Sequence, residues 1–595
     1  MPRDRSDHHH RRDRSAGPDG AAGRRGEPDD LTGAPTGDLT GALHALHDGP
    51  YARYRSLTGR RWALLPGVAF SLARAQADPF APPSRCEVRV DAATAGFADL
   101  GLDVPARRRA LAGHLARAAR DAAGGTFRVD AGGQEVVQRS SCEVGADGAV
   151  VLRFGYHLPG PRRRADGRTA ARDLTGALPA LVRSALLAGA LDAARVRAFV
   201  DAVEDAAVLR SRLPELGLVA FVADGAVLPR RSGVDPRPAL DAVPFASPPS
   251  LRVEVDLPHR GTVSGMGLPE GVTVVVGGGF HGKSTLLAAL REGVHDHVPG
   301  DGRELVVTVA DAAAVRAEDG RAVTRVDVGA FVSGLPGGLD PRDFTTADAS
   351  GSTSQAAAVV EALEAGSRLL LVDEDTAATN LMVRDARMQA LVAKAAEPLN
   401  PFVDLVRPLH ARHGVSTVLV AGASGDFLDV ADRVLLMRGF RCEDVTARAR
   451  EVAARPTGRA VEAGGFPPVR HRVVDPRSLD PRVRERRRVG ARGTDALLFG
   501  EHEVDVRAVA QFTDPSQVAG AGYALDHLVA AGHLDGRRTL AAALELLAAD
   551  LAGEVAGWTG GAGADAAVPR PHEVAAALNR LRGLRVGALR EAPGG

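Results

Sequence analysis

The chain has 595 residues, of which 45% are hydrophobic and 25% charged, and its formal net charge is zero. A chain of this length is too long to fold around one compact core, which predicts about three or four domains. Zero net charge gives no overall attraction to nucleic acid or membrane. No apolar run reaches the roughly 18–20 residues that cross a bilayer, no signal-type stretch follows the N-terminal charges, and three distant cysteines form no disulfide framework. We therefore expect a cytoplasmic protein without membrane insertion.

The pattern along the chain predicts four parts. Residues 1–38 are charged and nearly free of apolar side chains, so we expect a disordered tail. Residues 39–245 mix helix and strand patterns and predict an α+β domain. In residues 246–440, short apolar runs alternate with helical stretches, which predicts an α/β domain with a parallel-rich sheet. Residues 441–595 start with an arginine-rich segment and predict a mainly helical domain.

The spacing of apolar residues also predicts individual elements. In chain order they are helix 103–123, strand 150–156, helix 180–209, strand 218–222, strand 273–276, helix 284–290, helix 356–365, strand 369–372, strand 417–421, helix 539–551 and helix 572–581. The elements between 273 and 421 alternate between strand and helix, which is typical of a sheet covered on both faces.

The strongest motif is a glycine-rich loop between a predicted strand and a predicted helix. It matches G-x-x-x-x-G-K-[ST] and consists of Gly277, Gly278, Gly279, Phe280, His281, Gly282, Lys283, Ser284 and Thr285. Glycines let backbone N–H groups turn toward phosphate oxygens, and the helix N-terminus adds partial positive charge. Lys283 would reach the β- and γ-phosphates, and the Ser284 hydroxyl would ligate Mg²⁺. We therefore predict that this loop binds ATP; the alternative is a turn that binds nothing.

The choice of lysine in this loop is informative. Lysine occurs only at Lys283 and Lys394. Apart from histidine, every other basic side chain in the sequence is arginine. An ammonium is a compact point charge, whereas a planar guanidinium fits poorly beside phosphates in a tight loop. A lysine at position 283 therefore favours a phosphate-binding role.

A second motif places carboxylates at the end of an apolar strand. Residues 369–372 are followed by Asp373, Glu374 and Asp375. Ligands of parallel sheets bind at the carboxyl ends of the strands. We predict that Asp373 holds Mg²⁺ and that Glu374 polarises the attacking water, so that Glu374 and Lys283 are the candidate catalytic residues. Asp375 has no assigned role, and the alternative for all three is an acidic strand end that faces solvent.

The third motif is a serine-rich segment that precedes a predicted helix. It consists of Ser350, Gly351 and Ser352. Ser352 and Gln355 fit a capping box, so the helix is expected to start there. A capped helix start needs no further function. The N–H groups at such a start nevertheless form a site that can bind an anion.

The order of these motifs resembles the ABC class of ATPases and, more narrowly, the soluble family known as predicted ABC-class ATPases, which lack membrane domains. The resemblance runs from about Leu43 to the C-terminus and includes residues 76–81, 229–233 and 422–426. It implies an α/β fold with an ABC-type P-loop ATPase core and flanking domains. It also implies ATP and Mg²⁺ as ligands and ATP hydrolysis as the activity.

The resemblance further implies that two copies of the chain work together. Ser350, Gly351 and Ser352 would match the ABC signature, which contacts the γ-phosphate bound to a facing ATPase unit. The chain has one glycine-rich loop of this kind, so a complete site would need a second copy. We therefore predict an ATP-dependent homodimer, with residues 376–380 crossing the interface and hydrolysis moving the flanking domains.

The chain departs from transporter-type ABC domains in three places. Gly422 and Ala423 stand where a switch histidine is expected. No aromatic residue stands shortly before the loop to stack on adenine, and the expected glutamine is not evident in residues 331–338. These departures predict slow hydrolysis and leave the adenine preference open.

Clusters of arginine support an alternative function. They comprise Arg482, Arg484, Arg486, Arg487, Arg488 and Arg492, together with residues 162–164 and 230–231. Such clusters neutralise the phosphates of RNA or DNA, or else form solvated charged faces. Few aromatic residues lie nearby, so no base-stacking platform is visible. The alternatives to an ATPase are thus a nucleic-acid-binding protein that uses ATP as a slow switch, and an ATP-binding scaffold without turnover.

Overall fold

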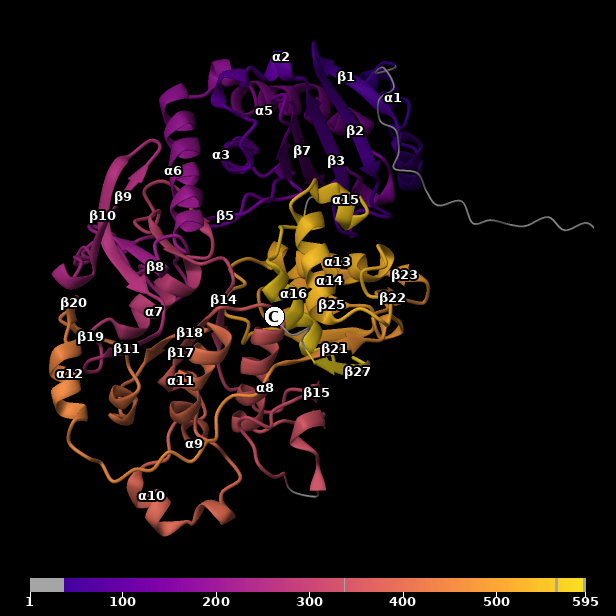
Figure 1. Cartoon of the computed structure of the whole chain (residues 1–595). Helices are drawn as coiled ribbons and strands as arrows, with labels where there is room; N and C mark the ends of the chain where they lie inside the picture. The colour runs from indigo at the N-terminus through magenta and orange to yellow at the C-terminus, as the bar shows by residue number, and fades with distance from the viewer. Residues whose placement is uncertain (1–36, 336–337, 562–564, 592–595) are drawn as a thin grey trace, which may run out of the picture. The chain divides into compact units, whose positions relative to one another are not determined.

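The computed structural model of this chain describes residues 37–335, 338–561 and 565–591. The predicted tail at residues 1–38 lies outside the described residues except for its last two. Of these, Asp38 accepts a hydrogen bond from the Gly41 N–H and caps the first helix, α1 (Leu39–His44). Two six-stranded sheets and one four-stranded sheet form most of the described strand structure, together with smaller sheets (Figure 1).

An antiparallel sheet with the strand order β1-β2-β3-β7-β4 forms the N-terminal part, and β6 also pairs with β7. Its strands are β1 (Arg61–Leu65), β2 (Val68–Arg74), β3 (Ser84–Val90), β4 (Phe127–Arg128), β6 (Cys142–Val144) and β7 (Val150–Tyr156). Buried residues alternate with half-buried ones along β7, as expected for a strand that packs mainly on one face. Its helices are α2 (Ala92–Ala95), α3 (Pro105–Ala122), α4 (Gly167–Arg172), α5 (Leu178–Ala185) and α6 (Ala193–Arg212).

The predicted helix over residues 180–209 is wrong as a single element, because the structure divides it into α5 and α6. Asp192 starts α6 by accepting hydrogen bonds from the N–H groups of Ala194 and Arg195. Leu187 and Leu191, in the connection between the two helices, pack against the same core as the helices themselves. The apolar spacing therefore continues across the break and hides it in the sequence.

The central sheet is the parallel-rich sheet that the sequence predicts. Its order is β14-β17-β18-β11-β19-β20, and each neighbouring pair is parallel except β19 with β20. The strands are β11 (Val272–Val276), β14 (Ala312–Val315), β17 (Leu369–Asp373), β18 (Ser416–Val420), β19 (Arg433–Arg438) and β20 (Arg441–Asp444). The three strands predicted in this region are confirmed to within one residue at each end.

Both faces of the central sheet are covered. Alternate residues of β17 belong to two different buried clusters, one shared with α7 (Lys283–Glu292) and the other with α8 (Gly351–Glu364) and α11 (Phe402–His413). In Figure 1, α7 and α11 lie on opposite sides of this sheet. Double-sided burial explains why the strands read as continuous apolar runs rather than as alternating patterns.

Smaller sheets and further helices complete the fold. A four-stranded sheet, β13-β8-β10-β9, contains β8 (Leu218–Ala223), β9 (Arg252–Leu257), β10 (Gly261–Pro269) and β13 (Val306–Thr308). The other strands up to residue 346 are β5 (Glu135–Val136), β12 (Asp296–His297), β15 (Val323–Val326) and β16 (Phe344–Thr346). The helices between β17 and the C-terminal part, besides α11, are α9 (Thr379–Met382), α10 (Ala386–Leu391) and α12 (Thr446–Ala453).

The C-terminal part combines helices with short strands. Its helices are α13 (Pro515–Ala530), α14 (Leu540–Leu551), α15 (Val555–Thr559) and α16 (Pro571–Asn579). Its strands are β21 (Arg470–Val474), β22 (Arg482–Val483), β23 (Arg486–Arg487), β24 (Val489–Arg492), β25 (Ala496–Phe499), β26 (His502–Asp505) and β27 (Val586–Glu591). The helices predicted over 539–551 and 572–581 match α14 and α16.

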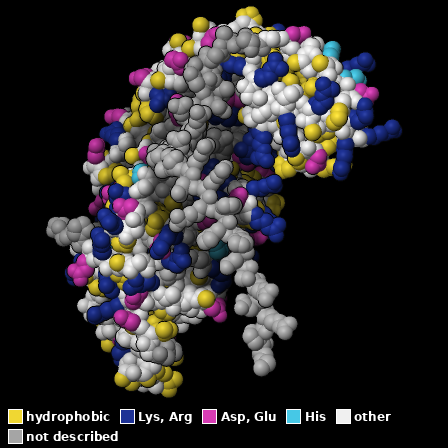
Figure 2. Space-filling model, turned by 90° about the vertical axis from the view of Figure 1, so that its right-hand side faces the viewer, with side chains coloured by type: hydrophobic (Ala, Val, Ile, Leu, Met, Phe, Trp, Pro, Cys, Tyr) yellow, Lys and Arg dark blue, Asp and Glu magenta, His cyan; other side chains and the backbone are white. Residues whose placement is uncertain are grey.

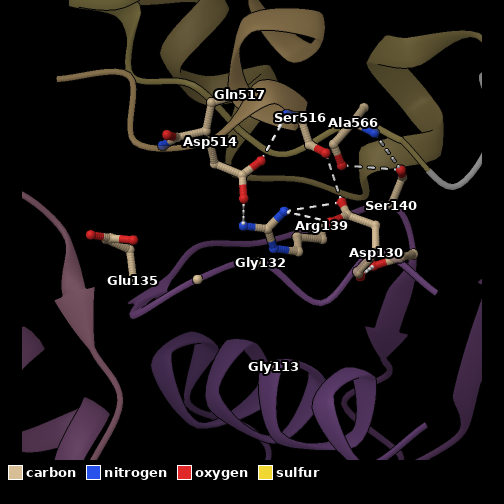
Figure 3. Close-up of polar contacts among 12 residues, drawn as sticks. Gly113, Asp130, Gly132, Glu135, Arg139, Ser140, Asp514, Ser516, Gln517 and Ala566 are labelled. Atoms are coloured by element: carbon tan, nitrogen blue, oxygen red, sulfur yellow. Dashed lines mark hydrogen bonds and ion pairs between the residues drawn. The ribbon is translucent and has the colours of Figure 1, made fainter. Parts of the chain in front are cut away.

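A buried ion-pair network joins the N-terminal segment before β6 to the start of α13 (Figure 3). Arg139 is 4% exposed, and its guanidinium donates to Asp130 at 3.0 Å and to Asp514 at 2.6 Å. The neighbouring Ser140 exchanges backbone and side-chain hydrogen bonds with Ala566. Burial acts to raise the pKa of Asp514, but the charge of Arg139 outweighs it and holds this pKa below its usual value.

We expect Arg139→Met to lower the free energy of unfolding by about 3–5 kcal/mol, because it leaves the Asp514 carboxylate buried without its cation. Since the folded-state pKa of Asp514 is depressed, the pair stabilises the protein above the unfolded-state pKa of about 3.9. That stability is lost as the pH falls through the folded-state value. Denaturant unfolding at several pH values measures both effects. The control is Arg120→Met, which breaks an exposed pair with Asp121; equal losses in the two variants would contradict the prediction.

Candidate functional site

The glycine-rich loop lies between β11 and α7, as predicted. Gly277 has φ +143°, and a Cβ there would lie 2.3 Å from the carbonyl oxygen of Met437. Gly282 has φ +97° and precedes the first residue of α7. These two positions therefore require glycine. Phe280 also has a positive φ, +62°, and its side chain is fully exposed.

Lys283 and His281 hold the loop in its conformation. The Lys283 ammonium donates hydrogen bonds to the carbonyl oxygens of Gly277 at 2.8 Å and Gly278 at 2.9 Å. The His281 Nδ1 accepts a hydrogen bond from the Gly439 N–H at 2.8 Å. The first contact keeps a positive charge against the loop backbone, and the second ties the loop to the turn between β19 and β20.

The acidic end of β17 lies beside the start of α7. Ser284 and Asp373 line the same cavity of about 80 Å³, together with Arg316 and Thr376. Hydroxyl and carboxylate oxygens are the donors that Mg²⁺ takes in proteins, so the pair fits this ion. Arg316 was not predicted as a site residue. It follows β14, and only the sheet order, which sets β14 beside β17, brings it to this cavity.

Glu374 follows Asp373 and is held by backbone donors. One of its carboxylate oxygens, Oε2, accepts hydrogen bonds from the N–H groups of Gly422 and, at 3.0 Å, Ala423. Gly422 and Ala423 are the residues that stand where a switch histidine is expected. The loop after β18 therefore contacts the acidic strand end through its backbone, a role that no residue type in the sequence reveals.

The serine-rich segment caps α8, but not as predicted. Ser350 is the N-cap, and its hydroxyl accepts a hydrogen bond from the Thr353 N–H. The capping box of Ser352 and Gln355 is wrong, because Ser352 lies inside the helix and Gln355 is buried. The Gln355 side-chain oxygen instead accepts from the Ala378 N–H at 2.7 Å. This bond ties α8 to residues 376–380.

The cavity lined by Ser284 and Asp373 has none of Ser350, Gly351 and Ser352 in its lining. The glycine-rich loop and the acidic strand end are thus adjacent, whereas the third predicted motif lies outside their shared cavity.

A second cavity, of about 220 Å³, adjoins the loop. Its lining comprises Leu228, Pro229, Ala239, Asp241, Ala242, Val243, Phe245, Gly282, Thr285, Met437 and Phe440. This lining is mostly apolar, and Phe440 contributes an aromatic ring from the turn between β19 and β20. The sequence shows no aromatic side chain shortly before the loop, and the fold brings two phenylalanines, Phe245 and Phe440, to this cavity.

Many of the clustered arginines are paired within the protein. Arg230 forms an ion pair with the buried Asp301 at 2.8 Å, and Arg164 pairs with Asp48 at 2.7 Å. Arg487 pairs with Asp526 at 2.6 Å. Figure 2 shows Lys and Arg side chains at several places on one face, with acidic side chains among them. Arg482 of β22 likewise lies 3.5 Å from Asp480, so the arginines of this hairpin also have acidic neighbours.

Among the described residues, no helix combines the length and apolar character needed to pass through a membrane. Three family models match successive parts of the chain. The model for the N-terminal part of ATPases of the ABC class matches residues 36–189, the ABC ATPase P-loop domain matches 192–472, and the MRB1590 C-terminal domain matches 488–587.

A relative matches part of the chain. The uncharacterised protein MJ1628 of Methanocaldococcus jannaschii is 28% identical over 247 residues, which are 40% of this chain and 53% of the relative. The match spans about half the length of this curated relative.

Two solved structures also match. One is the ADP conformation of MJ1267, an ATP-binding cassette of an ABC transporter, with 14% identity over 33% of this chain and 89% of that one and a TM-score of 0.22. The other is cbiO1 of Clostridium perfringens, part of an ABC transporter complex, with 16% identity over 40% and 92% and a TM-score of 0.25. On the family models and the α/β fold that carries the glycine-rich loop, this chain belongs to the ABC-class ATPase family, with its P-loop domain between an N-terminal and a C-terminal domain.

Proposed function

We propose that this chain binds ATP with Mg²⁺ at the glycine-rich loop and hydrolyses it. The observation that carries the proposal is that Ser284, at the start of α7, and Asp373, at the end of β17, line one cavity. Lys283 and Glu374 are their neighbours in the chain. Phosphate release from Mg²⁺–ATP by the purified protein tests the proposal, and tight ATP binding with no turnover under any condition would reduce it to a nucleotide-binding scaffold.

Each residue has one role in this proposal. Lys283 and the loop N–H groups of residues 277–285 neutralise the phosphates, and Ser284 and Asp373 hold Mg²⁺. When bound, Mg²⁺ offsets negative charge on the β- and γ-phosphates. Glu374, held by two backbone N–H groups, polarises the water that attacks the γ-phosphate.

We further propose that the apolar cavity beside Gly282 receives the base and that Phe440 stacks on it. Replacing Phe440 by Ala is expected to weaken ATP binding by roughly 1–3 kcal/mol, the usual contribution of an aromatic ring to base stacking. Titration of nucleotide into the two proteins by calorimetry measures the change. Phe80→Ala removes another exposed phenylalanine and serves as the control; unchanged affinity in Phe440→Ala would show that the base binds elsewhere.

A complete site would need a second copy of the chain in this proposal. Ser350, Gly351 and Ser352 would contact the γ-phosphate bound to the facing copy, and residues 376–380 would line the interface. The bond between Gln355 and Ala378 supports this arrangement, because it connects α8, which begins at the serine-rich segment, to residues 376–380.

The same arrangement supports movement of the flanking domains. Arg472 is 2% exposed and pairs with Glu364 at the end of α8 while also donating to Asn579 of α16 at 2.7 Å. A displacement of α8 on dimer formation would therefore reach the C-terminal domain. The proposal keeps the predicted domain boundaries at residues 38, 245 and 440. These separate the N-terminal tail, the N-terminal domain, the P-loop domain and the C-terminal domain.

We expect Glu374→Gln to become a dimer when Mg²⁺–ATP is added, because ATP that is bound but not hydrolysed would keep two copies together. Size-exclusion chromatography with light scattering measures the molar mass of the protein with and without nucleotide. Lys283→Ala, which is expected to bind ATP poorly, should stay monomeric. If the molar mass of Glu374→Gln does not change with ATP, the result would contradict the dimer but not the proposed ATP-binding site.

Nucleic-acid binding is the second candidate function, and one surface favours it. Arg482, Arg484 and Arg486 are exposed on the hairpin of β22 and β23. Arg482 and Arg484 line a cavity of about 490 Å³ together with Arg477 and Arg585, and its lining also includes Asp480, Glu485 and Glu501. Arginines at such spacing contact phosphates, and this binding weakens as salt is added. A gel shift with RNA and DNA that is absent, or that does not respond to salt, would count against this function.

A further inference from the structure

Three side chains that ligate metals meet in the C-terminal part, outside the residues assigned to ATP. His527 lies in the last turn of α13, and Asp550 lies in the last turn of α14. His533 lies between the two helices. In the part of the chain that the structure describes, these three form the one group of three or more His, Cys, Asp or Glu side chains whose ligand atoms all lie within 4.8 Å of one another.

The geometry of the group is convergent. The Nε2 atoms of His527 and His533 lie 2.7 Å and 2.6 Å from the same oxygen, Oδ2, of Asp550. The two imidazole rings are 5.8 Å apart and inclined at 81°, so their nitrogens approach the carboxylate from different directions. All three residues are half-buried. An ion held at about 2.0–2.2 Å from each donor would replace these two hydrogen bonds.

The donor set selects a class of ion. Two imidazole nitrogens and one carboxylate oxygen are ligands of Zn²⁺ and of neighbouring divalent transition metals, whereas Mg²⁺ takes mainly oxygen ligands. Three protein ligands leave the fourth tetrahedral position to water.

We propose that His527, His533 and Asp550 bind one Zn²⁺ ion or a similar divalent transition metal. The ion would join the C-terminal ends of α13 and α14 and fix residues 531–539 between them. This role is separate from ATP binding, because none of the three residues lines the cavities beside the glycine-rich loop.

Calorimetric titration and thermal unfolding with Zn²⁺ test the proposal on the full-length chain after treatment with a chelator. Every protein carries His8, His9 and His10 replaced by Ala, since that run is a second source of imidazole ligands. The test variants are His533→Ala and Asp550→Asn. The control is His47→Ala, which breaks a His–Asp pair with Asp166 that has an N···O distance of 3.4 Å.

We expect the parent protein and His47→Ala to bind Zn²⁺ with the same affinity and to gain melting temperature when it is added. Affinity should fall at least tenfold in His533→Ala and in Asp550→Asn, and their melting temperature should no longer respond. Mg²⁺ should give no such response in any of the proteins.

Two results would overturn the proposal. One is a parent protein whose melting temperature and heat of titration do not respond to Zn²⁺. The other is equal Zn²⁺ affinity in the parent and in His533→Ala. A fall in the metal-free melting temperature of the variants, with no Zn²⁺ response in the parent, would assign the three residues to a His–Asp–His ion pair alone. An unchanged far-ultraviolet circular dichroism spectrum in each variant verifies that the protein is folded.

Discussion

Lys283→Ala will lower ATP turnover by about 10²–10³-fold, the usual loss when one donor to transition-state charge is removed. The ammonium supplies a compact positive charge where negative charge develops on the β- and γ-phosphates. Its present partners are the carbonyl oxygens of Gly277 and Gly278, so it already lies against the loop. Lys283→Arg should not restore turnover, because a planar guanidinium replaces the point charge.

The chain offers a matched control for this experiment. Lys394 is the other lysine, and its ammonium likewise donates to two backbone carbonyl oxygens, those of Glu397 and Leu399. Lys394→Ala therefore removes the same kind of contact outside the loop and should keep wild-type turnover. Steady-state phosphate release measures all three variants. Equal rates for Lys283→Ala and the wild type would remove the loop from the reaction.

Glu374→Gln will lower turnover by about 10²–10⁴-fold while leaving ATP binding intact, as expected when a general base is lost. The substitution separates charge from position, since the glutamine side-chain oxygen can still accept from the N–H groups of Gly422 and Ala423. A loss of rate would therefore report the missing negative charge and not a displaced side chain.

Asp375→Asn is the control for Glu374, because Asp375 is the next carboxylate along and is exposed. It should change turnover little. Single-turnover hydrolysis beside an ATP-binding titration distinguishes the chemical step from affinity. If Asp375→Asn loses turnover and Glu374→Gln retains it, the assignment of the base moves by one residue.

The parts of the site that could be predicted are those encoded by neighbouring residues. Neighbouring residues identify both motifs. The apolar run 369–372 ends in Asp373, and the glycine-rich loop stands between a strand pattern and a helix pattern. The capping box at Ser352 failed because Ser350 reaches the same helix end and Gln355 has a partner 23 positions away. Local patterns do not show which of two competing partners a side chain takes.

Other contributors depend on the sheet order and on long-range contacts. Arg316 reaches the cavity of Ser284 because β14 pairs with β17, and Phe440 reaches Gly282 from a turn far along the chain. The hydrogen bonds to the Glu374 carboxylate come from backbone N–H groups, which every residue except proline carries. These features have no residue-type signal. The roles of the site residues themselves stay predictions until turnover is measured.

The scarcity of lysine makes the loop chemically addressable. Reagents that acylate amines find two side-chain targets in this sequence, Lys283 and Lys394, because guanidinium groups do not react with them. One target stands in the glycine-rich loop, and the other lies outside it with the same kind of carbonyl partners. The ratio of label on the two peptides therefore gives an internally referenced readout of loop occupancy in the unmodified protein, without a mutation or an attached fluorophore.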